Sequence, residues 1–140
     1  MSELFYKNQF GSVSLTIEDN IMVAQFKGAI SSGIVSYFIK ASEVALSKIK
    51  TPHWGYVSYS EQADAATPDA LKELFIVGQN FHNAGCVKSA YVLKSAIAIS
   101  QVKKLRDSIN VTEPLSDVLF DEIKGAHQFV SEYLKSYQPN

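Results

Sequence analysis

The stretch "VAQFKGAISSGIVSYFIKASEVALSKIK", residues 23–50, contains the change of hydrophobic period that decides the fold. Its first residues continue a segment in which apolar and polar side chains alternate, which is the pattern of a half-buried strand. After Ser31 and Ser32, either of which can cap a helix, the apolar residues recur every three or four positions: Ile34, Tyr37, Phe38, Ala41, Val44, Ala45 and Ile49. Thr51-Pro52 ends this pattern, because the residue before a proline avoids the helical region. The stretch therefore predicts a strand that leads directly into an amphipathic helix.

A hairpin is predicted immediately before that helix. In "SVSLTIEDNIMVAQF", residues 12–26, the apolar positions Val13, Leu15 and Ile17 are in phase, and the pattern breaks at Asp19-Asn20 before it resumes. Aspartate and asparagine tolerate the positive φ angles of tight turns. Residues 1–10 are expected to form a polar N-terminal arm.

The rest of the chain alternates strand and helix patterns. We expect strands in "HWGYVSYS" and "CVKSAYVL", a loop over residues 60–69, helices from Pro68 and over residues 95–109, a short strand near residues 118–120 and a final helix over residues 121–137. Right-handed crossovers between these strands favour parallel pairing. The sequence thus predicts an α/β fold, as one domain over residues 1–140. Its mixed, mostly parallel sheet would have about five strands, starting with an antiparallel hairpin, and about four helices.

Composition excludes several classes of function. The 13 basic and 14 acidic residues nearly cancel, so no overall field favours nucleic acid, and "KKLR" at Lys103 to Arg106 is expected to be a solvated helix face. The single cysteine, Cys86, excludes an internal disulfide and a multi-thiolate metal site. The three histidines lack the spacing of a metal site, and no phosphate-binding glycine motif occurs, so neither a metal nor a cofactor is expected.

Targeting features are equally sparse. The N-terminus lacks a basic region followed by an apolar stretch, so a secretory signal is not expected. The sequence also has no uncharged apolar run of the roughly 18 residues that a membrane-spanning helix requires. We therefore expect a cytoplasmic protein without a membrane span.

The chain resembles the SpoIIAA-like proteins of the STAS superfamily, whose founding member is an anti-anti-sigma factor. The resemblance covers Phe10 to Leu134 and rests on three segments: "VAQFKGAIS" before the first helix, "WGYVSYS" before the second, and "LFDEIKGAHQFVSEYL" at the end. It implies a STAS-like fold and a non-enzymatic regulatory or protein-interaction module in a bacterial cytoplasm, acting through a protein partner or as a homodimer.

The same resemblance directs attention to Thr67. In phosphorylatable STAS regulators, a serine in an Asp-Ser-Ser-Gly type turn at the start of the second helix is modified by a partner kinase. Here "YSEQADAATPDAL" occupies that region without the tetrad, so Thr67 is predicted chiefly as a helix N-cap, followed by Pro68 and Asp69. Phosphorylation is the alternative, since a helix N-terminus favours negative charge. Ser60, Thr67 and Asp69 are the candidate regulatory or partner-contact residues.

A second candidate site is apolar. Tyr37, Phe38 and Phe75 are expected mainly in the core, but they could also line a groove between the first two helices that accepts a partner helix or a small apolar ligand. The architecture also resembles that of lipid-carrying STAS-like relatives. The alternative function is therefore a binding module or carrier for a small amphipathic or lipid-like ligand. A cavity between helices and sheet would favour it, and a solidly packed interior would exclude it.

Overall fold

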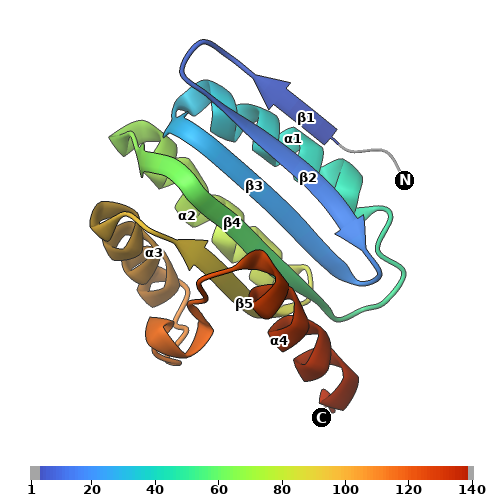
Figure 1. Ribbon diagram of the computed structural model, residues 1–140. Coiled ribbons are helices and arrows are strands. Elements are labelled where there is room, and N and C mark those ends of the chain that lie inside the picture. The colour runs from blue at the N-terminus through green and yellow to red at the C-terminus, as the bar shows by residue number, and fades with distance from the viewer. Residues whose placement is uncertain (1–3, 139–140) are drawn as a thin grey trace.

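A computed structural model describes residues 4–138, and a five-stranded sheet forms its centre (Figure 1). The strands follow one another across the sheet in chain order: β1 Leu4–Lys7, β2 Gly11–Glu18, β3 Ile21–Ile30, β4 Trp54–Ala66 and β5 Cys86–Leu93. The first three strands pair antiparallel, whereas β3, β4 and β5 pair parallel. The predicted mixed sheet with an N-terminal antiparallel hairpin is confirmed, and Asp19 has the positive φ, 60°, expected of a turn residue.

Helices cover both faces of the sheet. Three lie on one face, namely α1 Ser32–Leu46, α2 Pro68–Asn83 and α3 Ala96–Ser108, and α4 Ile123–Ser136 lies on the other (Figure 1). Alternation along β4 explains this arrangement, because Tyr56 belongs to the cluster packed under α1 and α2 while Val57 belongs to the cluster under α4. The fold is thus a three-layer α/β arrangement with the four predicted helices. None of the helices among residues 4–138 has the length and apolar character needed to cross a membrane.

Two segments differ from the sequence-based expectation. Part of the expected polar arm, Leu4–Lys7, is strand β1, which turns into β2 where the Asn8 side chain accepts hydrogen bonds from the backbone of Phe10 and Gly11. The expected strand near residues 118–120 is instead a 3-10 turn, Leu115–Val118, followed by a single parallel bridge between Leu119 and Tyr91. The sheet therefore contains one more antiparallel pair than expected.

A third difference concerns the expected loop over residues 60–69. Strand β4 continues to Ala66 because β3 also extends that far, and its pairing reaches Ile30 opposite Ala66. The register shifts twice along this half of the pair, and each shift places one extra residue in β4. Such bulges bend a strand and re-aim its side chains. The first of them falls next to Ser60.

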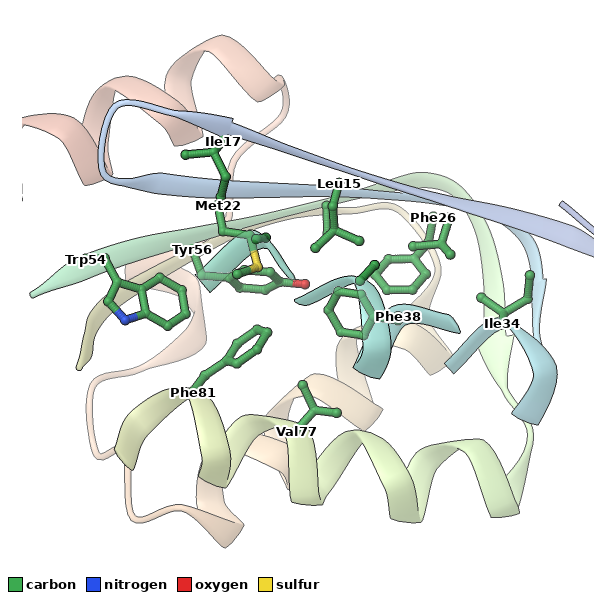
Figure 2. Close-up of a cluster of buried hydrophobic side chains, with 14 of the residues drawn as sticks. Leu15, Ile17, Met22, Phe26, Ile34, Phe38, Trp54, Tyr56, Val77 and Phe81 are labelled. Carbon is green, nitrogen blue, oxygen red and sulfur yellow. The ribbon is translucent and has the colours of Figure 1, made fainter. Parts of the chain in front are cut away.

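An aromatic cluster fixes the second half of α2 against the sheet. Figure 2 shows Phe81 rising from α2 between Trp54 and Phe38, and its ring meets theirs edge-on at centroid distances of 5.3 Å and 6.0 Å. Edge-to-face pairs of this kind add about 0.5–1.5 kcal/mol each beyond the buried area. The indole of Trp54 also donates a hydrogen bond to the carbonyl oxygen of Ala84 at 3.0 Å. These contacts hold one end of α2 firmly.

Candidate functional site

A cavity of about 550 Å³ lies between the sheet and the helices α2 and α3. Its helical walls are apolar, with Leu74 and Val77 from α2 and Val102 and Leu105 from α3. The sheet side is formed by β4 and β5, whose central residues there are serines and tyrosines rather than branched aliphatic residues. Since serine is small, it leaves unfilled the space that a leucine or phenylalanine would occupy. The interior is therefore not solidly packed at this point.

The floor of the cavity is polar because of the alternation along β4. Tyr56, Ser58 and Ser60 point to the same face, and all three are buried. The hydroxyls of Ser58 and Ser60 are 3.2 Å apart and hydrogen-bond to each other. Burial raises the pKa of Tyr56 well above its usual value, although its hydrogen bond with Ser58 acts in the opposite direction. At neutral pH the floor thus offers protonated hydroxyl groups.

One end of the cavity is charged. Lys88 on β5, Arg106 on α3 and Glu113 in the α3–α4 connection all line it. Lys88 Nζ lies 2.9 Å from Glu113 Oε2, and Arg106 Nη2 lies 3.6 Å from Glu113 Oε1. The Arg106 side chain is only 5% exposed, lies over the Tyr91 ring, and donates a hydrogen bond to the Glu113 carbonyl oxygen at 2.9 Å. A buried guanidinium thus faces the cavity.

Gln101 of α3 lines the cavity away from the charged end. Its side-chain amide forms two hydrogen bonds with the backbone of Ala66: it accepts from the N–H at 2.9 Å and donates to the carbonyl oxygen at 3.0 Å. Strand β5 ends opposite Ser60, so the last residues of β4 extend beyond it. Gln101 therefore takes the place of a neighbouring strand and ties α3 to the sheet.

The predicted regulatory residues occupy two different places. Thr67 is the N-cap of α2, where its hydroxyl accepts from the backbone N–H of Ala70 at 3.3 Å, and Pro68 is the first helical residue. The predicted cap is confirmed. Thr67 and Asp69 are both exposed, whereas Ser60 is buried in the cavity floor. The structure does not bring the three together.

The three residues predicted to line an apolar groove also lie in different places. Phe38 lines the cavity from α1, but Tyr37 stacks on Tyr6 with ring centroids 5.2 Å apart, and Phe75 is half-buried on α2 outside the lining. The hollow lies between α2 and α3 rather than between the first two helices. The reason is that the space between α1 and α2 is filled by the aromatic cluster around Phe81, whereas the cavity faces the small side chains of Ser58 and Ser60 on β4.

Sequence reasoning missed the charged end. Lys103 and Lys104 are exposed, as expected for a solvated face, but Arg106 in the same run is 4% exposed and points inward. A signal for this was present, because Arg106 follows Val102 by four positions and so continues the apolar stripe of α3. Lys88 and Glu113 gave no comparable signal, since their pairing joins segments far apart in the sequence.

Cys86, His127 and the possible metal ligands are the remaining groups that could carry chemistry. Burial raises the pKa of Cys86 to about 11, despite weaker opposing interactions with Ser89 and the Lys88 carbonyl, so the thiol is protonated at neutral pH. His127 lies on the opposite side, 3.4 Å from Glu18. Within residues 4–138, no three His, Cys, Asp or Glu side chains gather in a way that could hold a metal ion.

Comparison with known proteins shows the fold. No protein-family model and no curated protein matches the sequence. Among solved structures, an uncharacterised protein of the DUF3478 family from Shewanella loihica PV-4, with a SpoIIAA-like fold, matches with a TM-score of 0.67 and 12% identity, over 89% of this chain and 98% of that one. The structure of SLC26A9 matches with a TM-score of 0.60 and 10% identity, over 84% of this chain.

The two matches differ in extent. The chain spans 21% of the length of SLC26A9, whereas it corresponds to nearly all of the Shewanella protein. At these identities the likeness concerns the course of the backbone and not the side chains of the cavity. The resemblance predicted from the sequence is therefore confirmed at the level of the fold, and the chain has a SpoIIAA-like α/β fold.

Proposed function

We propose that the protein is a non-enzymatic binding module for a small amphipathic ligand, held between α2, α3 and the sheet. The cavity carries this proposal. Its volume of about 550 Å³ falls within the range of roughly 300–1,000 Å³ that is typical of small-molecule sites. Apolar helical walls, a few hydroxyl groups and one charged end form the combination that binds a molecule with an apolar body and a polar group.

The protonation states of two cavity residues, Tyr56 and Cys86, support a binding role for these groups over a nucleophilic or general-base role. Burial keeps both the Cys86 thiol and the Tyr56 hydroxyl protonated at neutral pH, because it raises their pKa values. A nucleophile or general base needs a pKa that is close to the operating pH or lowered below it. These groups are suited to hydrogen bonding with a ligand, not to attacking one.

Filling the cavity tests the proposal. Val102→Phe introduces a ring into the α3 wall, and Val44→Phe makes the same change at a position on α1 that is 46% exposed and outside the cavity. We expect decanol to bind the wild-type chain and the Val44→Phe variant with similar affinity, and to bind Val102→Phe at least roughly tenfold more weakly. Native mass spectrometry of the protein purified from its own cells would reveal a ligand already bound. Equal binding to all three chains would place decanol elsewhere and contradict the proposal.

Regulation through phosphorylation is the second candidate function, and the position of Thr67 favours it. Its exposed hydroxyl begins α2, which forms one wall of the cavity, so a phosphate there would sit at the end of a ligand-binding element. The positive end of the helix dipole would stabilise that phosphate. Intact and fragment mass analysis of the protein from its own cells checks this: phosphate on Thr67 supports the reading, and an unmodified chain under all growth conditions argues against it.

A regulatory function would also involve interaction with a partner protein or a second copy of the chain. The large apolar side chains that are exposed on the described part of the chain are dispersed over β1, the β1–β2 turn, α1, α2 and α3: Phe5, Phe10, Val44, Ile76 and Ile97. Ile76, at 60% exposure, lies on the helix that Thr67 caps. Sedimentation of the unmodified and phosphorylated chains would detect a homodimer or a change of assembly.

A further inference from the structure

The charged end of the cavity carries more positive than negative charge. Two cations, Lys88 and Arg106, share the carboxylate of Glu113. Asp64, the other acidic residue of the described lining, is exposed on β4 beyond Ser60, towards the opposite end. Two positive charges minus one negative charge leave a net charge of +1 at this end.

The carboxylate of Glu113 lies closer to Lys88 than to Arg106. Its 2.9 Å contact with Lys88 is a hydrogen-bonded ion pair, whereas the 3.6 Å separation from Arg106 is too long for a hydrogen bond. The Lys88 ammonium also makes a cation–π contact with Tyr133, whose ring centroid lies 4.3 Å from Nζ. The carboxylate of Glu113 therefore mainly neutralises Lys88, and the charge of Arg106 is left less well compensated.

Arg106 retains the capacity to bind an anion. Its Nη2 group donates to the Glu113 carbonyl oxygen and the guanidinium also interacts with the Tyr91 side chain, but a guanidinium has five N–H donors. Arg106 is buried and the nearest carboxylate oxygen lies 3.6 Å away, so a ligand that supplies a hydrogen-bonded counter-ion gains more than it would at the surface. The planar guanidinium also matches a carboxylate, which it can bind through two parallel hydrogen bonds.

We propose that the ligand is an amphiphile with a single carboxylate, which pairs with Arg106 while its apolar body lies against Leu74, Val77 and Val102. The inference rests on the proposed function, because it names the chemical class of the molecule that the same cavity holds. A single negative charge matches the net charge of +1. A doubly charged headgroup such as a phosphate monoester would bring an extra charge into the site without a partner.

Three probes with the same ten-carbon chain test the headgroup on the wild-type protein by isothermal titration calorimetry: decanoate, decanol and decylamine. Hydrogen bonds to a charged group are stronger than those between neutral groups, so we expect decanoate to bind at least roughly tenfold more tightly than decanol. Decylamine should bind no more tightly than decanol. This comparison needs no substitution and does not depend on the folding of a variant.

A pair of variants locates the effect. Glu113→Gln removes the carboxylate that competes with the ligand, so we expect a several-fold gain in decanoate affinity and no gain for decanol. Asp117→Asn makes the same change of charge at an exposed position in the same connection and should leave both affinities unchanged. Thermal unfolding of each variant confirms that it is folded.

The outcomes separate the two proposals. Equal affinities for decanoate and decanol, or a preference for decylamine, would overturn the carboxylate assignment while leaving the cavity as a ligand site. Failure of all three probes to bind would overturn the binding function itself. An equal gain from Glu113→Gln and Asp117→Asn would show that overall charge, not Arg106, attracts the anion, and would also overturn the assignment.

Discussion

Replacing Gln101 with alanine should destabilise the protein out of proportion to the small size of the change. The substitution removes two hydrogen bonds to the backbone of Ala66, of 2.9 Å and 3.0 Å, that join α3 to the end of β4. Both bonds are partly buried and not fully enclosed, so we use the net value of about 1 kcal/mol per bond and not the full cost of desolvation. The expected loss is about 2 kcal/mol.

Chain length converts this loss into a melting temperature. At about 2.1 cal/mol/K per residue, 140 residues give an unfolding entropy near 0.3 kcal/mol/K, so a loss of about 2 kcal/mol lowers Tm by about 7 °C. Differential scanning calorimetry measures the shift. Gln79→Ala is the matched control, because Gln79 bonds only the side chain of Asn83 on the exposed face of α2 among the described contacts. Equal Tm values for the two variants would refute the role assigned to Gln101.

Three further predictions concern the cap, the α4 layer and the cysteine. Thr67→Ala should cost about 1 kcal/mol in chemical denaturation because Ala70 loses its cap, whereas Thr67→Ser should be nearly neutral; a neutral alanine variant would contradict the cap. Gly55→Ala should cost about 1–3 kcal/mol because the added Cβ overlaps Val130 Cγ1, and Val130→Ala in the same chain should recover part of the loss; additive effects would exclude that contact. Burial raises the Cys86 pKa from 9.0 to about 11, so the thiol of the unfolded chain loses its proton first as pH rises. The free energy of unfolding should therefore fall between pH 9 and 11. At pH 9, iodoacetamide should react with the folded chain far more slowly than with a denatured one. Equal alkylation rates would show that the thiol is not buried.

Periodicity predicted most of the fold because local pattern determines local structure where one face is buried. The change of period after Ser31 and Ser32 and the turn at Asp19 placed β2, β3 and the start of α1 correctly, although α1 ends at Leu46 and not at Thr51. Thr67 was recognised as the cap of α2. Strand β1 was missed because "LFYK" is too short to show a period, although the Asn8 side chain that forms its turn is a recognisable turn signal.

The cavity could not be predicted in the same way, since it depends on which distant residues meet. Ser60 was singled out as a possible regulatory residue of a loop, but the continued pairing of β4 with β3 buries it. The contact between Lys88 and Glu113 joins positions 25 residues apart, and no local pattern records it. Arg106 is intermediate: its place on the apolar stripe of α3 was visible, but its partners were not.

The most direct test of the account is a crystal structure of the protein grown with decanoate. We predict electron density for the alkyl chain between α2, α3 and the serine-lined face of β4, with the carboxylate within hydrogen-bonding distance of the Arg106 guanidinium. Continuous protein packing in that space, or decanoate bound only on the surface, would contradict the claim that the cavity is a ligand site.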